Sequence, residues 1–79
     1  FMKNNLSHAF SKAIKAIRLQ RGLSQERLAE ISRLDRTYIS GIERETRNPT
    51  INSIQKIVRA LDTDEADFLD IVKEHLYEN

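Results

Sequence analysis

Apolar residues recur three or four positions apart along most of this 79-residue chain, and that spacing constrains its fold more than any other feature. Phe10, Ile14 and Ile17 form one such stripe, as expected for the inner face of an α-helix. No alternation of apolar and polar residues continues over the length of a strand. Two glycines and one proline leave little room for long loops. The sequence therefore predicts one all-α domain covering residues 1–79.

Candidate capping residues divide this pattern into five helices. The expected helices run from Ser7 to about Arg21, Ser24 to about Ser32, Asp35 to about Glu45, Thr50 through Leu61, and from Asp62 or Thr63 onward. Further residues expected to face inward in the first three helices are Ala13, Leu28, Ala29, Ile31, Ile39 and Ile42. The fourth helix carries the apolar residues Ile51, Ile54, Ile57, Val58 and Leu61.

Charge is unevenly distributed, although the net charge is only +1. Residues 1–49 carry ten Lys and Arg against five Asp and Glu, whereas residues 50–79 carry three against seven. A basic N-terminal part suits a polyanion, and an acidic C-terminal part is expected to face away from it. The chain has no cysteine and no apolar run long enough for a bilayer, so we expect a bacterial cytoplasmic protein with Met2 as its natural start.

The segment from Leu23 to Thr50 carries the strongest functional pattern. Two short helices joined by a tight turn at Arg33-Leu34 are typical of a helix-turn-helix, whose second helix enters the major groove of DNA. The amide of Gln25, at the start of the first of these helices, can bind a phosphate. On the outer side of the second helix, Arg36 can bond guanine and Thr37 a base or phosphate. We expect the DNA-facing set to include Ser40, Gly41 (leaving room for close approach), Arg44 and Arg47.

Several short motifs make the chain resemble the lambda-repressor-like, Cro/repressor class of helix-turn-helix proteins. They are Gly22-Leu23-Ser24-Gln25, Leu28-Ala29, Tyr38-Ile39-Ser40, Ile42-Glu43-Arg44 and Arg47-Asn48-Pro49-Thr50. Within that class the chain is most similar to the controller proteins of restriction–modification systems. The resemblance implies a five-helix domain that binds a pseudo-palindromic operator as a homodimer and regulates transcription of its own operon, with RNA polymerase as a further candidate partner.

The resemblance also implies roles for individual residues. Tyr38 joins the DNA-facing set, and Arg18 and Glu43 match a structural pair that bridges the first and third helices. The two charges lie on helix sides that also carry core residues, where an unpaired charge would be costly, so we assign them to structure. Arg33 and Glu45 depart from the class because glycine is usual at both positions; the turn at Arg33 is expected to need a positive φ.

The fifth helix has a wider apolar face than one intramolecular stripe requires. This width favours a subunit interface contributed by residues 50–79. The residues expected in that interface are Ile54, Phe68, Leu69, Val72 and Leu76.

Three alternatives remain open from the sequence. A phage-type repressor and the antitoxin of a toxin–antitoxin pair share the DNA-binding motif, and a helical protein-interaction adaptor would use the domain without DNA. An enzyme is not expected, because His8 and His75 are isolated and no nucleophile–base pair, phosphate-binding glycine loop or metal-ligand spacing is present. We therefore expect neither a cofactor nor a metal.

Overall fold

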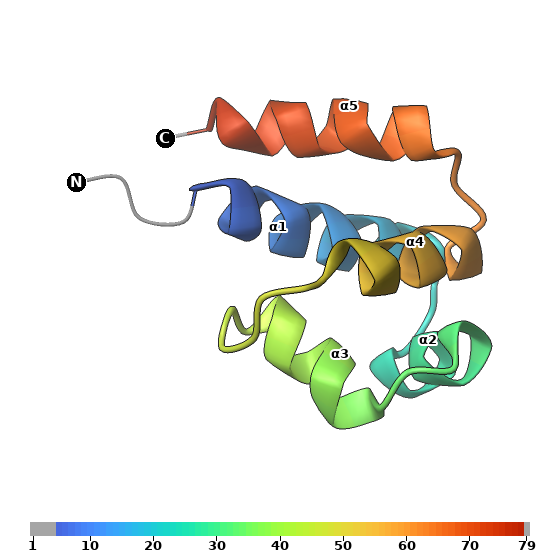
Figure 1. The fold of residues 1–79 in the computed structure, drawn as a ribbon. Helices are drawn as coiled ribbons and strands as arrows, with labels where there is room; N and C mark the ends of the chain where they lie inside the picture. The colour runs from blue at the N-terminus through green and yellow to red at the C-terminus, as the bar shows by residue number, and fades with distance from the viewer. Residues whose placement is uncertain (1–4, 79) are drawn as a thin grey trace.

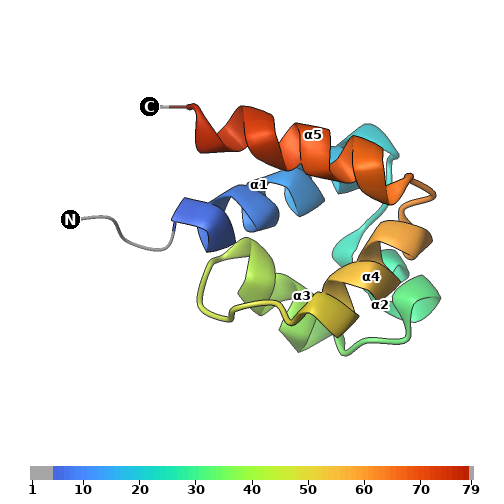
Figure 2. The same ribbon diagram turned by 45° about the horizontal axis from the view of Figure 1, so that its top comes forward.

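The computed structural model describes residues 5–78, which form five helices and, within that range, no strand. The helices are α1 (Asn5–Gln20), α2 (Gln25–Ser32), α3 (Arg36–Glu43), α4 (Ile51–Ala60) and α5 (Glu65–Leu76). Figures 1 and 2 show α5 running alongside α1, with α3 on the opposite side of α1. The predicted all-α helix-turn-helix architecture is confirmed, while Met2, the expected natural start, lies outside the described residues.

Polar side chains begin the helices, as the capping pattern predicts for α2 and α4. The Ser24 hydroxyl accepts a hydrogen bond from the Arg27 backbone N–H at 2.9 Å. The side chain of Thr50 accepts one from the Ser53 N–H at 3.0 Å, and the Ser53 hydroxyl accepts one from the Thr50 N–H at 3.0 Å, so the two residues form a capping box. Asp35 precedes α3 with extended backbone, but its side chain makes no capping hydrogen bond.

Two predicted caps are wrong. Ser7 lies inside α1, because that helix already includes Asn5. The cap of α5 is Asp64, whose carboxylate accepts from the N–H of Ala66 at 2.7 Å, and neither Asp62 nor Thr63. Three consecutive residues of capping type stand before α5, so their sequence alone does not identify the one whose backbone is extended.

The ends of α1 to α4 share one geometry. Each of these helices is followed by a residue with positive φ, namely Gly22, Arg33, Glu45 and Asp62. In each case the next N–H bonds a carbonyl five residues back, for example Leu34 to Ala29 at 3.1 Å and Thr46 to Gly41 at 2.9 Å. This is the Schellman arrangement, which satisfies the last carbonyls of a helix. The positive φ expected at Arg33 is therefore confirmed at 61°.

The core lies between α1 and the other four helices. Among the residues described, its apolar members are Ala9, Ala13, Ile14, Ile17, Leu28, Ala29, Ile39, Ile42, Ile57, Val58, Leu61, Phe68 and Val72. One predicted core residue is wrong: Ile31 is 42% exposed, because it lies at the edge of the apolar stripe of α2. Ile51, at the start of α4, is 79% exposed. No helix within residues 5–78 is long and apolar enough to cross a membrane.

Candidate nucleic-acid interface

The outer side of α3 presents polar and cationic side chains to solvent. Ile39 and Ile42 are fully buried on its inner side, which leaves Arg36 and Thr37 exposed at its start and Ser40 partly exposed one turn later. Arg44 follows directly after the helix, and its guanidinium donates to the Ser40 hydroxyl at 2.6 Å. Arginine and hydroxyl groups of this kind are the donors that read base edges and grip phosphates in a major groove.

Tyr38 attaches α3 to α4. Its hydroxyl lies 2.8 Å from the Ser53 hydroxyl, and the Thr50 N–H donates to it at 3.4 Å. Tyr38 therefore holds the first turn of α3 against the start of α4. Since α3 has only eight residues, such tertiary contacts are what keep it helical.

A buried ion pair holds the C-terminal end of α3. The Arg18 guanidinium donates to both carboxylate oxygens of Glu43, from Nε at 2.6 Å and from Nη2 at 2.8 Å. Its Nη1 donates to the carbonyl of Leu23 at 2.8 Å. The hydrogen bond to Glu43 raises the pKa of Arg18 above its ordinary value against the opposing effect of burial. The predicted structural pair is confirmed, and it ties α1 to α3.

Gln25 joins the same network. Its side-chain amide donates to Glu43 at 3.0 Å, so the carboxylate accepts three hydrogen bonds. A carboxamide nitrogen carries two N–H groups, so one of them remains for a phosphate at the start of α2. The network thus fixes the Gln25 side chain at the helix end where backbone N–H groups also point outward.

The loop after α3 corrects the role assigned to Gly41. Gly41 is buried, and a Cβ added there would lie 2.6 Å from Cγ of Arg47. The space that this glycine leaves is therefore taken by the stem of Arg47 and is not open to DNA. The Arg47 guanidinium lies 5.8 Å from the centroid of the Tyr38 ring, so its positive charge lies next to α3.

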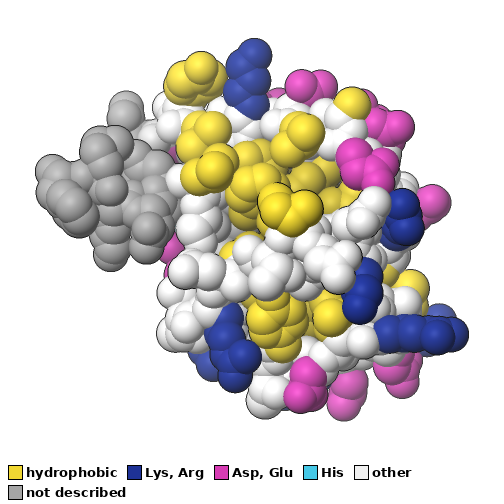
Figure 3. All heavy atoms as spheres, in the orientation of Figure 1, with side chains coloured by type: hydrophobic (Ala, Val, Ile, Leu, Met, Phe, Trp, Pro, Cys, Tyr) yellow, Lys and Arg dark blue, Asp and Glu magenta, His cyan; other side chains and the backbone are white. Residues whose placement is uncertain are grey.

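An apolar surface lies between α5 and the loop that follows α3. Figure 3 shows hydrophobic side chains gathered over α1, α4 and α5. Two adjoining grooves share Phe10, Ile51 and Ile54, and one of them continues to Leu6 and the other to Leu69. We call these five residues the apolar face. Phe68 and Val72, predicted at a subunit interface, are buried in the core of this chain because α5 packs against α1. That interface assignment is therefore wrong for both.

A comparison with protein families matches residues 14–68 to the family described as helix-turn-helix. The chain belongs to the helix-turn-helix family. The match spans the turn, both of its helices and the supporting α4, which are the elements that the sequence motifs identified.

This helix-turn-helix protein is similar to control proteins over most of its length. It is 46% identical to the control protein C.BamHI of Bacillus amyloliquefaciens over 70 residues, covering 87% of this chain and 86% of that protein. Identity to the control protein C.SmaI of Serratia marcescens is 39% over 59 residues, covering 75% and 70%. The structure of the restriction-modification controller protein C.Esp1396I superposes with a TM-score of 0.92 at 42% identity, covering 96% and 100% of the two chains.

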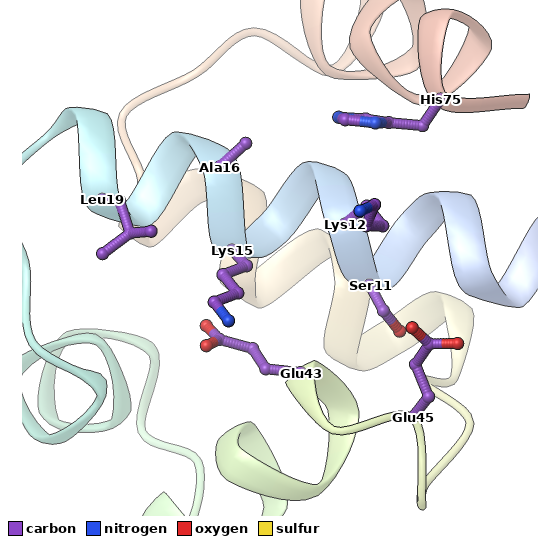
Figure 4. Close-up of a pocket in the computed structure, with 8 residues that line it drawn as sticks. All are labelled: Ser11, Lys12, Lys15, Ala16, Leu19, Glu43, Glu45 and His75. Atoms are coloured by element: carbon purple, nitrogen blue, oxygen red, sulfur yellow. The ribbon is translucent and has the colours of Figure 1, made fainter. Parts of the chain in front are cut away.

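Figure 4 shows a polar depression beside the end of α3, between α1 and α5. The side chains of Lys15 and Glu43 point toward one another across it, and Leu19 lies at its end. Residues 5–78 include no group of three or more potential metal ligands.

The sequence missed the part of the apolar face that comes from Leu6, Phe10 and Ile51, since helical spacing marks them as apolar without showing that they share a surface.

Proposed function

We propose that this helix-turn-helix protein is a sequence-specific transcription regulator, and that it acts as the controller protein of a restriction–modification system. It binds a pseudo-palindromic operator at the promoter of its own operon as a homodimer. The observation that carries the proposal is the outer side of α3, where exposed Arg36 and Thr37 stand on a helix whose other side is locked into the core. Support comes from relatives that are control proteins and from a similar structure of a tetramer in complex with its natural 35 base-pair operator.

Readout is expected to begin at the start of α3. Arg36 donates to guanine and Thr37 contacts a base or a neighbouring phosphate, while Gln25, Arg44 and Arg47 contribute phosphate or groove-edge contacts. In a two-fold dimer the two copies of α3 enter successive major grooves about 34–36 Å apart. The acidic α5 lies on the opposite side of the molecule from α3, away from the phosphates (Figure 1).

The first experiment measures operator binding. DNA upstream of the protein's own gene is footprinted, and the protected site is titrated by fluorescence anisotropy with wild type, Arg36→Ala and Lys73→Ala. Each substitution removes one exposed positive charge, but Lys73 lies on α5. We expect Arg36→Ala to weaken specific binding about 5- to 150-fold and Lys73→Ala to change it less than twofold. Equal losses for Arg36→Ala on operator and random DNA would make Arg36 a phosphate contact.

The second experiment tests the dimer. The apolar face is the surface that a second copy is proposed to cover, since it is contiguous and exposed. Leu69 is 54% exposed on this face, and Leu19 is 59% exposed at the polar depression. Light scattering with size-exclusion chromatography should show that Leu69→Asp shifts the protein toward monomer whereas Leu19→Asp does not. A wild-type protein that stays monomeric at tens of micromolar would contradict the dimer.

Two other candidates, a phage-type repressor and the antitoxin of a toxin–antitoxin pair, keep the DNA-binding domain but regulate other genes. Similarity to the immunity repressor protein of Bacillus phage phi105, at 44% identity over 48 residues, favours a phage-type repressor as the second candidate. The neighbouring genes distinguish these candidates: a restriction endonuclease or methyltransferase gene indicates a controller protein, phage genes a repressor, and a toxin gene an antitoxin. An adaptor that binds protein instead of DNA would show no steep loss of DNA affinity with salt, whereas several phosphate contacts require one.

A further inference from the structure

We propose that Ser7 and His8 position Arg47 for DNA by holding the loop that follows α3. This inference rests on the proposed function, because Arg47 is one of the residues expected to contact the operator. Neither Ser7 nor His8 lies on α3 or in the turn before it, so both would act through the loop and not by touching a base themselves.

Two side-chain contacts connect the first turns of α1 to the loop. The Ser7 hydroxyl donates to Oδ1 of Asn48 at 2.9 Å. Nδ1 of His8 lies 2.8 Å from Oε1 of Glu45. Asn48 and Glu45 stand on either side of Arg47 in the sequence, so the two contacts hold the loop at both ends of the segment that carries the arginine.

The loop itself is bent sharply at this place. Glu45 has a φ of 64°, in the left-handed region that costs a non-glycine residue energy. The N–H groups of Thr46 and Arg47 both donate to the carbonyl of Gly41, at 2.9 and 3.2 Å. A contact that holds the Glu45 side chain therefore also favours the backbone conformation that turns Arg47 back over α3.

Holding the loop matters because arginine is flexible. An arginine that must be ordered when DNA binds loses rotamer freedom, and preorganisation lowers that cost. In this structure the stem of Arg47 already packs on Gly41 and its guanidinium lies over Tyr38. The contacts from Ser7 and His8 keep the loop in the position where both of these interactions are possible.

A double-mutant cycle on operator DNA tests the inference. His8→Ala and Ser7→Ala are each expected to weaken operator binding about two- to fivefold, the effect of losing a partly exposed polar contact. In the Arg47→Ala background the same substitutions should change binding less than about 1.5-fold, because the arginine that they position is absent. His8→Asn keeps an N–H at the position of Nδ1 for Glu45 and should restore most of the affinity, and Lys73→Ala is the control for general loss of charge.

A measurement without DNA separates positioning from stability. The backbone order parameter of Arg47, about 0.85 in a rigid loop, should fall in His8→Ala while those of Ile39 and Ile42 stay unchanged. The inference is overturned if His8→Ala leaves operator affinity unchanged, if its effect persists in the Arg47→Ala background, or if the order parameter of Arg47 does not move. Failure of the wild-type protein to bind any operator would instead refute the proposed function.

Discussion

The Arg18–Glu43 pair offers the clearest quantitative test of how α3 is held. The Arg18 side chain is 9% exposed and that of Glu43 is 2% exposed, and the two share two hydrogen bonds. In Glu43→Ala the guanidinium keeps only the Leu23 carbonyl as a partner, and the amide of Gln25 loses its acceptor. The variant therefore leaves a positive charge buried with no counter-charge.

The expected loss is large compared with the stability of so small a domain. Removing one partner of a buried ion pair costs about 3–5 kcal/mol. A chain of this length has a free energy of unfolding of about 4–12 kcal/mol, at roughly 0.05–0.15 kcal/mol per residue. Replacing both partners by methionine removes the uncompensated charge, so the double variant should lose at least about 2 kcal/mol less than the sum of the two single variants.

Urea unfolding followed by circular dichroism measures these differences. Wild type, Arg18→Met, Glu43→Met and the double variant are compared, together with Arg27→Met, which removes an exposed i,i+3 pair with Glu30. Arg27→Met should cost less than about 1 kcal/mol. The reasoning is refuted if Glu43→Met costs as little as Arg27→Met, or if the losses of Arg18→Met and Glu43→Met simply add.

Three further outcomes follow from the structure. Arg33→Gly should raise the free energy of unfolding by up to about 1 kcal/mol, since it relieves a positive φ, and an unchanged urea midpoint would contradict that strain. Phe68→Ala should cost about 3–5 kcal/mol in a dilution-independent way, whereas Leu69→Ala should mainly weaken association on dilution. The hydrogen bond to His75 lowers the pKa of the Glu78 carboxyl. The stabilisation from the charged carboxylate is therefore fully present at a pH above the ordinary pKa of the group, and it is lost as the pH falls through the lowered pKa. In His75→Ala, carboxyl chemical shifts should therefore titrate at a higher pH, and an unmoved midpoint would exclude His75 as the cause.

Local chemistry explains what the sequence predicts correctly. Ser24 and Thr50 are capping residues with a clear apolar run behind them, so both helix starts follow from the sequence. The resemblance to the Cro/repressor class is what implies that Arg18 pairs with Glu43, and the burial of the helix sides that carry these charges supports a structural role for both.

The errors concern surfaces that depend on how whole helices pack. Helical spacing identifies Phe68 and Leu69 as apolar, but only the packing of α5 against α1 shows that the first is buried and the second exposed. The same applies to Ile51, which lies on the apolar stripe of α4 and yet is directed outward beside Leu6. The contact of Gly41 with Arg47 also depends on the path of a loop, which spacing does not describe.

These observations explain how an eight-residue helix, about 12 Å long, can be aimed at DNA by so small a domain. Tyr38 attaches the first turn of α3 to α4, and Glu43 attaches its end to α1. Tyr38 lies on the side of α3 that faces away from Arg36 and Thr37, and Glu43 lies two turns beyond Arg36, at the other end of the helix. Substitutions at the anchors should therefore lower stability, while substitutions on the outer side should lower DNA affinity with little change in unfolding. A single helix can serve both purposes because Tyr38 and Glu43 contact other helices while Arg36 and Thr37 stay exposed.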